Sequence, residues 1–181
     1  MWFLTQEGVD RYDGKYIKHY NFSDDSIKLD SRIALNWLYM DSGNILWVIG
    51  QKGRIFRYDS QHDKFKLAYI HPELIRNKPQ AFLNYGYLDK NDRIWLCYKD
   101  SITWYDIRTG TTLHMPTPVN GEITAIEQTD SNHFFIGTGN GLFHAGIEKG
   151  KLNIMPDKMV EGIGTSVHEL YYHAVSKQLF V

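Results

Sequence analysis

Short apolar runs separated by polar turns recur along the chain, and the clearest example extends from Asp41 to Asp59. The apolar segment Ile45–Ile49 leads into the turn Gly50–Gly53, and a second run, Ile55–Tyr58, follows it. Apolar runs of this length, bounded by glycine and aspartate, predict two β-strands joined by a tight turn. Because a lone two-stranded hairpin is marginally stable in water, this segment requires further strands beside it.

The chain supplies such strands by repeating the same pattern. A bulky aromatic residue, which we call the anchor, follows an apolar residue in the second strand of each repeat. The anchors are Trp2, Trp47, Trp95, Phe135 and Phe180, at successive spacings of 45, 48, 40 and 45 residues. Strand-rich repeats of about 40 to 50 residues are typical of the four-stranded blades of a β-propeller.

We therefore predict an all-β fold, in which residues 1–181 form about four propeller blades of four antiparallel strands (A to D) and make up an incomplete propeller. The predicted blades are 1–23 (partial), 33–70, 81–115, 122–155 and 167–181 (the start of a fifth). The first lacks strand A and the last ends within strand B. Open blade edges would then pair with the remaining blades of a longer chain or, in a homo-oligomer, with another copy. The alternative is a four-bladed ring in which the two ends share one blade.

Residues suited to tight turns lie between these strands. Three residues before each later anchor stand Asn44, Asp92, Asn132 and Lys177. Asparagine and aspartate tolerate the left-handed backbone that a tight turn between strands A and B requires. Tyr-Asp pairs end strand C at Asp13, Asp59 and Asp106, where the carboxylate can accept hydrogen bonds from the next turn. A single helical turn is predicted at Pro72–Ile75.

Composition narrows the range of partners. The net charge of -1 gives no electrostatic attraction to nucleic acid or to an anionic membrane surface. No run approaches the ~20 apolar residues that a membrane helix needs, and no signal peptide is recognised. Cys97, the only cysteine, lies within an apolar run and is predicted to be a buried, inert thiol. We expect no cofactor, no nucleic-acid partner and no direct membrane contact.

The repeated pattern resembles a known sequence family. The segment Asp41–Asp59 contains an aspartate, an aliphatic residue followed by tryptophan, a glycine-bracketed turn and a final Tyr-Asp pair. The segment Ile136–Leu142 contains an Ile-Gly-Thr turn, and Trp2–Gly14 resembles the first blade of such a protein. This arrangement resembles the two-component regulator propeller repeat, which occurs in the N-terminal sensor region of hybrid two-component systems that join a histidine kinase to a response regulator. The resemblance covers the whole chain. Sialidase-type repeats place aspartate five residues before tryptophan, whereas Asp41 and Trp47 are six apart.

The resemblance implies a periplasmic sensor fragment that binds oligosaccharides derived from complex glycans and signals, through a downstream kinase, to transcription. It implies that this segment is not catalytic. Two other classes remain open: a truncated propeller enzyme, either a lyase or a glycoside hydrolase, and a protein-binding propeller scaffold.

The candidate ligand contacts are the turns that join strand B to strand C, provided that these turns and the interblade connections share one face. These turns supply Gln6, Glu7, Gln51, Lys52, Lys99, Asp100 and Asn140. The tryptophans divide into two groups. Trp2, Trp47 and Trp95 recur with the repeat and are predicted to pack between blades, whereas Trp37 and Trp104 do not recur and are candidates for an exposed role.

Other polar groups are better explained by structure than by catalysis. His168 and His173 are five residues apart in a predicted strand, so they point to opposite faces and we predict no metal site. Gly137–Gly141 joins two strands without the following helix that a phosphate-binding loop requires, and is predicted to be a hairpin turn. The pair Asp24–Asp25, together with Asp41, comes nearest to a catalytic carboxylate pair, but these residues lie in connections and are expected to stabilise turns.

Overall fold

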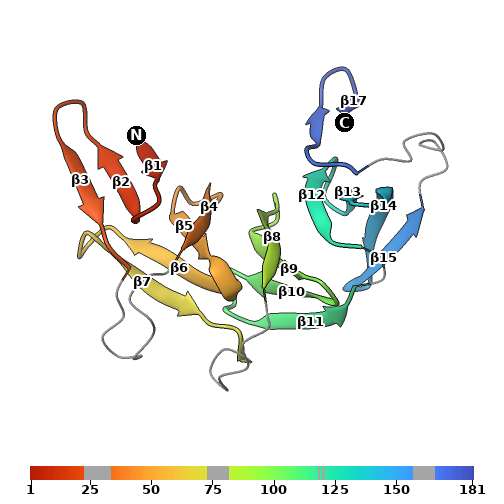
Figure 1. Cartoon of the computed structure of the whole chain (residues 1–181), viewed down its shortest axis with the longest axis horizontal. Helices are drawn as coiled ribbons and strands as arrows, with labels where there is room; N and C mark the ends of the chain where they lie inside the picture. Colours follow the sequence, from red (N-terminus) through yellow and green to blue (C-terminus); the bar gives the residue numbers. More distant parts are fainter. Residues whose placement is uncertain (23–33, 73–81, 118, 120, 157–165) are drawn as a thin grey trace. The chain divides into compact units, whose positions relative to one another are not determined.

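The computed structural model describes residues 1–22, 34–72, 82–117, 119, 121–156 and 166–181 (Figure 1). Within these residues the regular structure is almost entirely β, with one short 3-10 turn, η1 (Gln51–Gly53). The chain divides into two compact units, Met1–Gly86 and Tyr87–Val181, and each is described by itself. The predicted carboxylates Asp24 and Asp25, and all of the predicted turn Pro72–Ile75 beyond its first residue, lie outside the described residues.

The first unit contains a three-stranded and a four-stranded antiparallel sheet. The three-stranded sheet comprises β1 (Trp2–Leu4), β2 (Val9–Tyr12) and β3 (Ile17–Tyr20) in that order. The four-stranded sheet comprises β4 (Leu35–Met40), β5 (Leu46–Gly50), β6 (Arg54–Asp59) and β7 (Lys64–Tyr69), again in sequence order. Each strand pairs with its neighbours in the chain, as expected when short turns join antiparallel strands.

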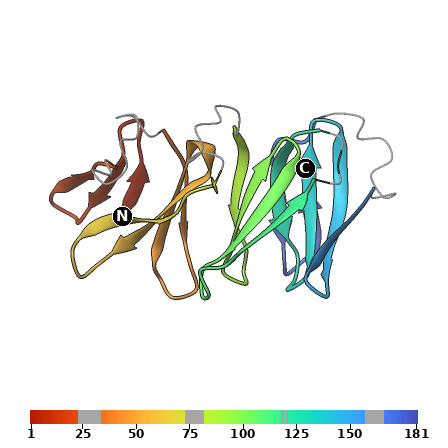
Figure 2. The same cartoon turned by 90° about the horizontal axis from the view of Figure 1, so that it is seen from below.

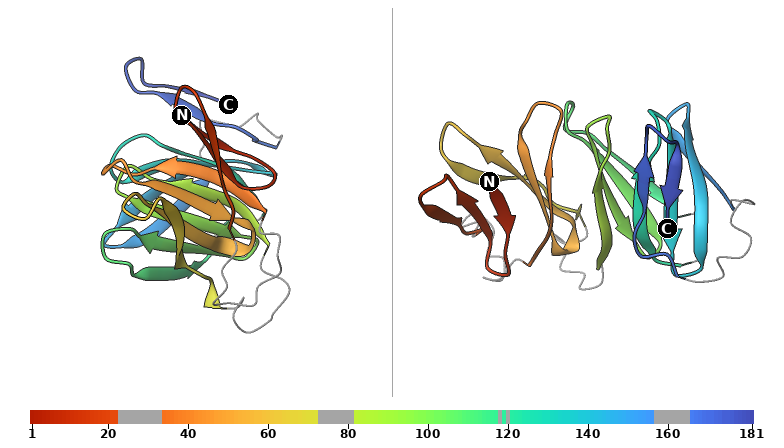
Figure 3. Two further views of the ribbon diagram at one scale, coloured as in Figure 1. Left: turned by 90° about the vertical axis from the view of Figure 1, so that its left-hand side faces the viewer. Right: turned by 90° about the horizontal axis from the view of Figure 1, so that it is seen from above.

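Strand β8 (Leu83–Leu88) crosses the boundary between the units and forms a four-stranded sheet with β9 (Arg93–Tyr98), β10 (Ser101–Asp106) and β11 (Thr112–Pro116). A further four-stranded sheet contains β12 (Ile123–Gln128), β13 (His133–Thr138), β14 (Gly141–Glu148) and β15 (Lys151–Pro156), whose strands are seen side by side in Figure 2. The hairpin of β16 (Tyr171–His173) and β17 (Gln178–Phe180) lies against β12 (Figure 3). The described sheets confirm the predicted fold class, all-β with four-stranded antiparallel sheets that match propeller blades.

Each sheet has two faces, which we name from the anchor in strand B. The forward face carries the anchor, and the rear face carries the residues on either side of it, because side chains alternate along a strand. In the first unit, Trp2 and Val9 on the forward face of β1–β3 pack in one apolar cluster with Val48 and Phe56 on the rear face of β4–β7. The core between these two sheets is therefore a forward face packed on a rear face.

The second unit contains the same kind of contact. Trp95, on the forward face of β8–β11, lies with its ring centroid 4.8 Å from that of Phe134 on the rear face of β12–β15. Both side chains are fully buried. Cys97 in β9 is also buried, and burial raises the pKa of its thiol, as predicted for an inert cysteine.

The anchors do not all behave alike. Trp47 and Trp95 are buried as predicted, but Phe135 is only half-buried and Phe180 is exposed. The prediction of an exposed Trp104 is wrong, because Trp104 pairs with Trp95 across β10 and β9 and the two ring centroids are 4.9 Å apart. A cross-strand aromatic pair of this kind stabilises a sheet and removes both rings from water.

A buried aspartate fixes the turn before Trp47. One carboxylate oxygen of Asp41 accepts hydrogen bonds from the backbone N–H groups of Gly43, at 2.9 Å, and Ile45, at 2.8 Å. The other accepts the indole N–H of Trp47 at 2.7 Å. Because a buried carboxylate is costly unless it is hydrogen-bonded, these contacts account for its position. The expected turn-stabilising role of Asp41 is confirmed.

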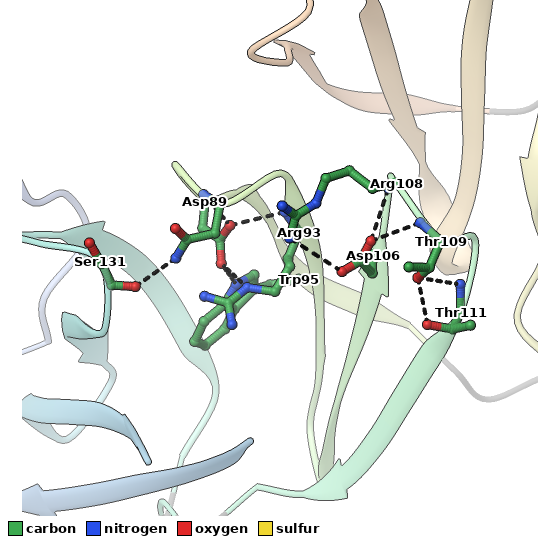
Figure 4. Close-up of polar contacts among 9 residues, drawn as sticks. Asp89, Arg93, Trp95, Asp106, Arg108, Thr109, Thr111 and Ser131 are labelled. Carbon is green, nitrogen blue, oxygen red and sulfur yellow. Dashed lines mark hydrogen bonds and ion pairs between the residues drawn. The ribbon is translucent and has the colours of Figure 1, made fainter. Parts of the chain in front are cut away.

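Asp89 repeats this arrangement in the second unit (Figure 4). One of its oxygens accepts backbone N–H groups from Asn91, at 2.9 Å, and Arg93, at 3.0 Å. The other oxygen accepts a hydrogen bond from the indole N–H of Trp95 at 2.9 Å and one from the Nε–H of Arg93 at 2.7 Å. The six-residue spacing from aspartate to tryptophan therefore encodes a turn and the placement of an anchor at once.

The remaining turns agree with the prediction in most places. Asn44 and Asp92 adopt left-handed φ angles of 60°, and so does Lys177 at 56°. Asn132 does not; there the side chain of Asp130 accepts the backbone N–H of Asn132 at 3.0 Å and supports a different turn. The predicted caps at the end of strand C are confirmed, because one oxygen of each aspartate accepts a backbone N–H from the turn that follows, at Asp13, Asp59 and Asp106.

Candidate functional site

The turn from strand B to strand C lies at the same end of the four-stranded sheet as the start of strand A and the end of strand D. In β4–β7, Gly50 pairs with Leu35 and Ile55 with Tyr69. The backbone N–H of Gln51 donates to the carbonyl of Ala34 at 2.7 Å. We call this end of each sheet the B–C end. The antiparallel register thus supports the condition on which the candidate contacts depend, within this sheet.

The two complete sheets further along the chain have the same arrangement. In β8–β11, Ser101 pairs with Pro116, and the N–H of Thr117 donates to the carbonyl of Asp100 at 3.0 Å. In β12–β15, Ile123 at the start of strand A pairs with Thr138 at the end of strand B. Each B–C turn therefore lies next to the connection that enters or leaves its own blade.

All seven candidate residues lie in these turns. Gln6, Glu7, Gln51, Lys99, Asp100 and Asn140 are exposed, whereas Lys52 is partly buried and has a left-handed φ of 66°. Within the first unit, no hydrogen bond or ion pair among the described residues joins Gln6 or Glu7 to Gln51 or Lys52. The structure gives the candidates equivalent positions in their own sheets but does not join these four into one cluster.

Threonine hydroxyls hold two of these turns in a fixed shape. Oγ1 of Thr5 accepts the N–H of Gly8 and donates to the carbonyl of the same residue, both at 3.1 Å. Oγ1 of Thr138 accepts the N–H of Asn140 at 3.0 Å and donates to the carbonyl of Gly141 at 3.1 Å. The segment Gly137–Gly141 is the predicted hairpin turn, with a φ of 129° at Gly141. Gln6, Glu7 and Asn140 therefore stand on preformed turns.

Trp37, predicted above to be a candidate for an exposed role, lies near the B–C end of the first unit. Trp37, partly exposed, pairs with Ile49 in β5 and lies 6.0 Å from the ring of Tyr85 at an angle of 72°. A Cβ atom on Gly86 would come within 2.9 Å of the indole of Trp37, so only glycine admits this contact without a shift. The repeated order Leu-Asn-aromatic, at 35–37 and 83–85, is the sequence signal for these strands.

A neighbouring amide and hydroxyl complete this region. Nδ2 of Asn84, on the face of β8 that also carries Gly86, is shielded from solvent and has no hydrogen-bond partner in the described structure. The hydroxyl of Tyr39 donates to the carbonyl of Gly86 at 2.7 Å and ties β4 to β8. An unpaired buried amide donor requires an acceptor, which a water or a bound ligand can supply. Trp37 therefore offers a partly exposed apolar ring, whereas the amide donor of Asn84 lies in the interior of the same unit.

A separate polar cluster joins the two sheets of the first unit. The carboxylate of Asp63 accepts hydrogen bonds from Lys18 at 2.5 Å, Tyr20 at 2.6 Å, Tyr58 at 2.5 Å and Arg11 at 3.2 Å. The bond from Lys18 and those from the two tyrosines hold the pKa of Asp63 below its usual range. Burial, followed by the bond to Asp63, raises the pKa of Tyr20. All four donors are engaged within the protein, so this cluster is structural.

Two negative findings apply to the described part of the chain. It contains no group of three or more His, Cys, Asp or Glu side chains arranged to hold a metal ion. None of its helices has the length and apolar character needed to cross a membrane. Nδ1 of His173, one of the two histidines considered above, lies 2.7 Å from Oγ of Ser176 in its own hairpin.

Comparison with known proteins supports the class of fold. No family model matches the sequence, and no curated protein matches it. Among solved structures, the chain is similar to the extracellular domains of two proteins assigned as hybrid two-component systems from B. thetaiotaomicron. The first has 18% sequence identity and a TM-score of 0.67, and the match covers 99% of this chain. The second has 14% sequence identity and a TM-score of 0.67, and the match covers 98% of this chain. The chain spans only 28% and 24% of those domains.

An enzyme shares the same fold. Virginiamycin B lyase from Staphylococcus aureus has 16% identity and a TM-score of 0.65, over 93% of this chain and 55% of the lyase. At these identities the likenesses define the class, a protein built of β-propeller blades, and leave the function to be argued from the residues.

Proposed function

We propose that this chain is part of the periplasmic sensor region of a hybrid two-component system and that it binds an oligosaccharide derived from a complex glycan. The observation that carries the proposal is the fold shared with extracellular domains of such systems over nearly the whole chain. The resemblance of Asp41–Asp59 to the two-component regulator propeller repeat supports it. The blades would be those divided at 1–23, 33–70, 81–115, 122–155 and 167–181, within a longer protein that carries the kinase.

The described side chains favour binding over catalysis. Asp41 is the one described member of the candidate carboxylate set, and both of its oxygens are occupied by the turn and by Trp47. A glycosidase requires two carboxyl groups free to face the scissile bond across a cleft. The likeness to a lyase therefore supports the enzyme alternative only as a fold.

The B–C end of the first unit offers the chemistry that a sugar requires. The partly exposed ring of Trp37 provides an apolar surface for the C–H groups of a pyranose. Gln51 and Lys52 lie in the turn at the same end of β4–β7, where exposed polar side chains can fix the orientation of a ligand. We assign the other turn candidates to the same role in their own sheets.

A glycan array probed with the whole chain, followed by calorimetry on the best oligosaccharide, tests this proposal. We expect Gln51→Ala to weaken binding about 2- to 10-fold, the loss of one hydrogen bond. Gln61→Ala is the matched control, because Gln61 is also an exposed glutamine and lies in the turn between β6 and β7, at the opposite end of the same sheet. Absence of binding to every glycan contradicts the proposed function, and equal weakening by both variants contradicts the proposed site.

A further inference from the structure

The charged side chains of β4–β7 are divided unevenly between the two ends of the sheet. The end opposite the B–C end holds three carboxylates, Asp41 before β5 and Asp59 and Asp63 around the turn from β6 to β7. The described residues at the B–C end are 34–36, 50–54 and 69–72. They include Lys52 and Arg54 but no aspartate or glutamate. The described part of the B–C end is therefore positively charged.

The segments that precede β4 and follow β7 add no net charge in the sequence. Segments 23–33 and 73–81 lie outside the described residues, and they contain four acidic and four basic side chains. The acidic residues are Asp24, Asp25, Asp30 and Glu73, and the basic residues are Lys28, Arg32, Arg76 and Lys78. The formal charges of these two segments cancel, so they do not offset the charges of Lys52 and Arg54.

Lys52 has no counter-ion within the described part of the chain. At the opposite end of the sheet, by contrast, Lys66 lies 2.5 Å from a carboxylate oxygen of Asp59. Glu7, in the turn between β1 and β2, forms no ion pair with Lys52. Lys52 is also partly buried, and a partly desolvated cation attracts an anion more strongly than a fully hydrated one does. Its ammonium group is therefore suited to bind an anionic group from outside the chain.

The position of Lys52 relates it to Trp37. Trp37 pairs with Ile49, which comes three residues before Lys52. Three residues of chain extend at most about 11 Å, a separation that a short oligosaccharide can span. The turn itself is held to the sheet, because the backbone N–H of Gln51 donates to the carbonyl of Ala34 at 2.7 Å. A partly exposed aromatic ring and an unpaired cation therefore belong to the same end of one sheet.

We propose that the ligand of this site is an acidic oligosaccharide, with a carboxylate or sulfate group paired with the ammonium group of Lys52 and a sugar ring on Trp37. A charge-assisted hydrogen bond is stronger than one between neutral groups, so this contact favours acidic over neutral glycans. The inference rests on the proposed function and adds to it the class of glycan that is bound.

A glycan array that carries uronic-acid, sulfated and neutral oligosaccharides tests this preference. The whole chain is applied at low and at physiological salt. We expect it to bind acidic members more strongly than neutral ones, and we expect the difference to shrink as salt rises, because salt screens an ion pair. The members that bind distinguish a carboxylate from a sulfate as the recognised group.

Variants of Lys52 test the residue itself, by calorimetry with the best acidic oligosaccharide and with its neutral form, made by carboxyl reduction or desulfation. Lys52→Met is expected to weaken binding of the acidic form about 3- to 30-fold and to leave binding of the neutral form unchanged. Lys52→Arg keeps the charge and should keep the preference. Lys64→Met is the matched control, because Lys64 is an exposed lysine in β7 at the opposite end of the same sheet. Trp37→Ala changes no charge and should weaken both forms alike.

Three outcomes overturn the inference and leave the proposed function in place. The first is an array on which only neutral glycans bind. The second is an acidic oligosaccharide that the wild type and Lys52→Met bind equally tightly, and the third is unchanged binding of both forms by Trp37→Ala. Binding to no glycan contradicts the proposed function, and the inference with it. Circular dichroism of each variant establishes that a change in affinity does not come from a loss of fold.

Discussion

Asp89 holds Trp95 in place: its carboxylate accepts the indole N–H at 2.9 Å while the opposite oxygen organises the turn that leads into β9. Asp41 and Trp47 have the same relationship at 2.7 Å. Because each of these tryptophans is an anchor of its sheet, the turn and the core depend on one carboxylate. The repeated aspartate, which in isolation could suggest an acid catalyst, is therefore a structural part of the repeat.

We expect Asp89→Ala to destabilise the protein by about 1–3 kcal/mol, since it leaves the buried indole N–H of Trp95 and the turn N–H groups without an acceptor. Denaturant unfolding followed by tryptophan fluorescence measures this change. Asp100→Ala, at an exposed position in the next turn, is the control and should change stability by less than about 0.5 kcal/mol. Equal stability of the Asp89 variant and the wild type would show that the carboxylate is dispensable.

Gly86 is expected to tolerate no larger side chain. A Cβ atom there would lie 2.9 Å from the indole of Trp37 and 3.0 Å from Cδ1 of Ile49, so Gly86→Ala should cost about 1–3 kcal/mol through overpacking. It should also shift the emission of Trp37 as the ring moves. Gly139→Ala is the matched control, because nothing lies within 4 Å of its Cβ position. Comparable loss of stability in the two variants would contradict the close contact at Gly86.

The sequence predicted features that depend on short spacings and on strand order. The six residues from Asp41 to Trp47 encode a turn and an anchor within one local segment, so the pattern identifies both. The position of the B–C turns at a common end of each sheet follows from antiparallel pairing alone. Both features could be predicted because no distant contact is needed to establish them.

The predictions for Phe135 and Trp104 were wrong because the burial of each side chain depends on a substitution within the repeat or on a residue in another strand. Thr129 lies six residues before Phe135, at the position that aspartate holds in the turns before Trp47 and Trp95. Its backbone N–H donates to the carbonyl of His133, as the N–H groups of Asp41 and Asp89 do to carbonyls in their own turns. The anchor Phe135 therefore has no carboxylate like the one that holds Trp47. Trp104 is buried by its cross-strand partner Trp95, a contact that the spacing of the repeat does not encode.

Trp37 was predicted to be a candidate for an exposed role, but its contact with Gly86 was not predicted, for a similar reason. The contact between Trp37 and Gly86 joins strands that lie a whole repeat apart, and nothing in either segment alone shows that a glycine faces an indole. The same applies to Asn84, whose unpaired amide is defined by its surroundings in the fold.

The Asp63 cluster predicts a pH dependence of stability in the first unit. The pKa of Asp63 is lowered in the folded state from its ordinary value of 3.8, chiefly by the hydrogen bond from Lys18. A carboxyl group whose pKa falls on folding stabilises the folded state above its unfolded pKa, and this contribution is lost as pH falls through 3.8 toward the folded value. The cluster should therefore contribute fully at pH 7 and progressively less below about pH 4.

Asp63→Asn isolates this contribution. Asparagine keeps the shape of the side chain and tolerates the left-handed φ of 48° at this position, so the backbone should remain unstrained. Thermal unfolding at pH 7 should give a lower Tm for the variant than for the wild type, and the gap should narrow as the pH is lowered below about 4. The comparison cancels the effects of the other groups that titrate in acid, including Asp59, whose pKa is also lowered, and Glu127, whose pKa is raised by burial. A gap in Tm that stays constant from pH 7 to pH 3 would show that the charge of Asp63 contributes nothing to the contact between the two sheets.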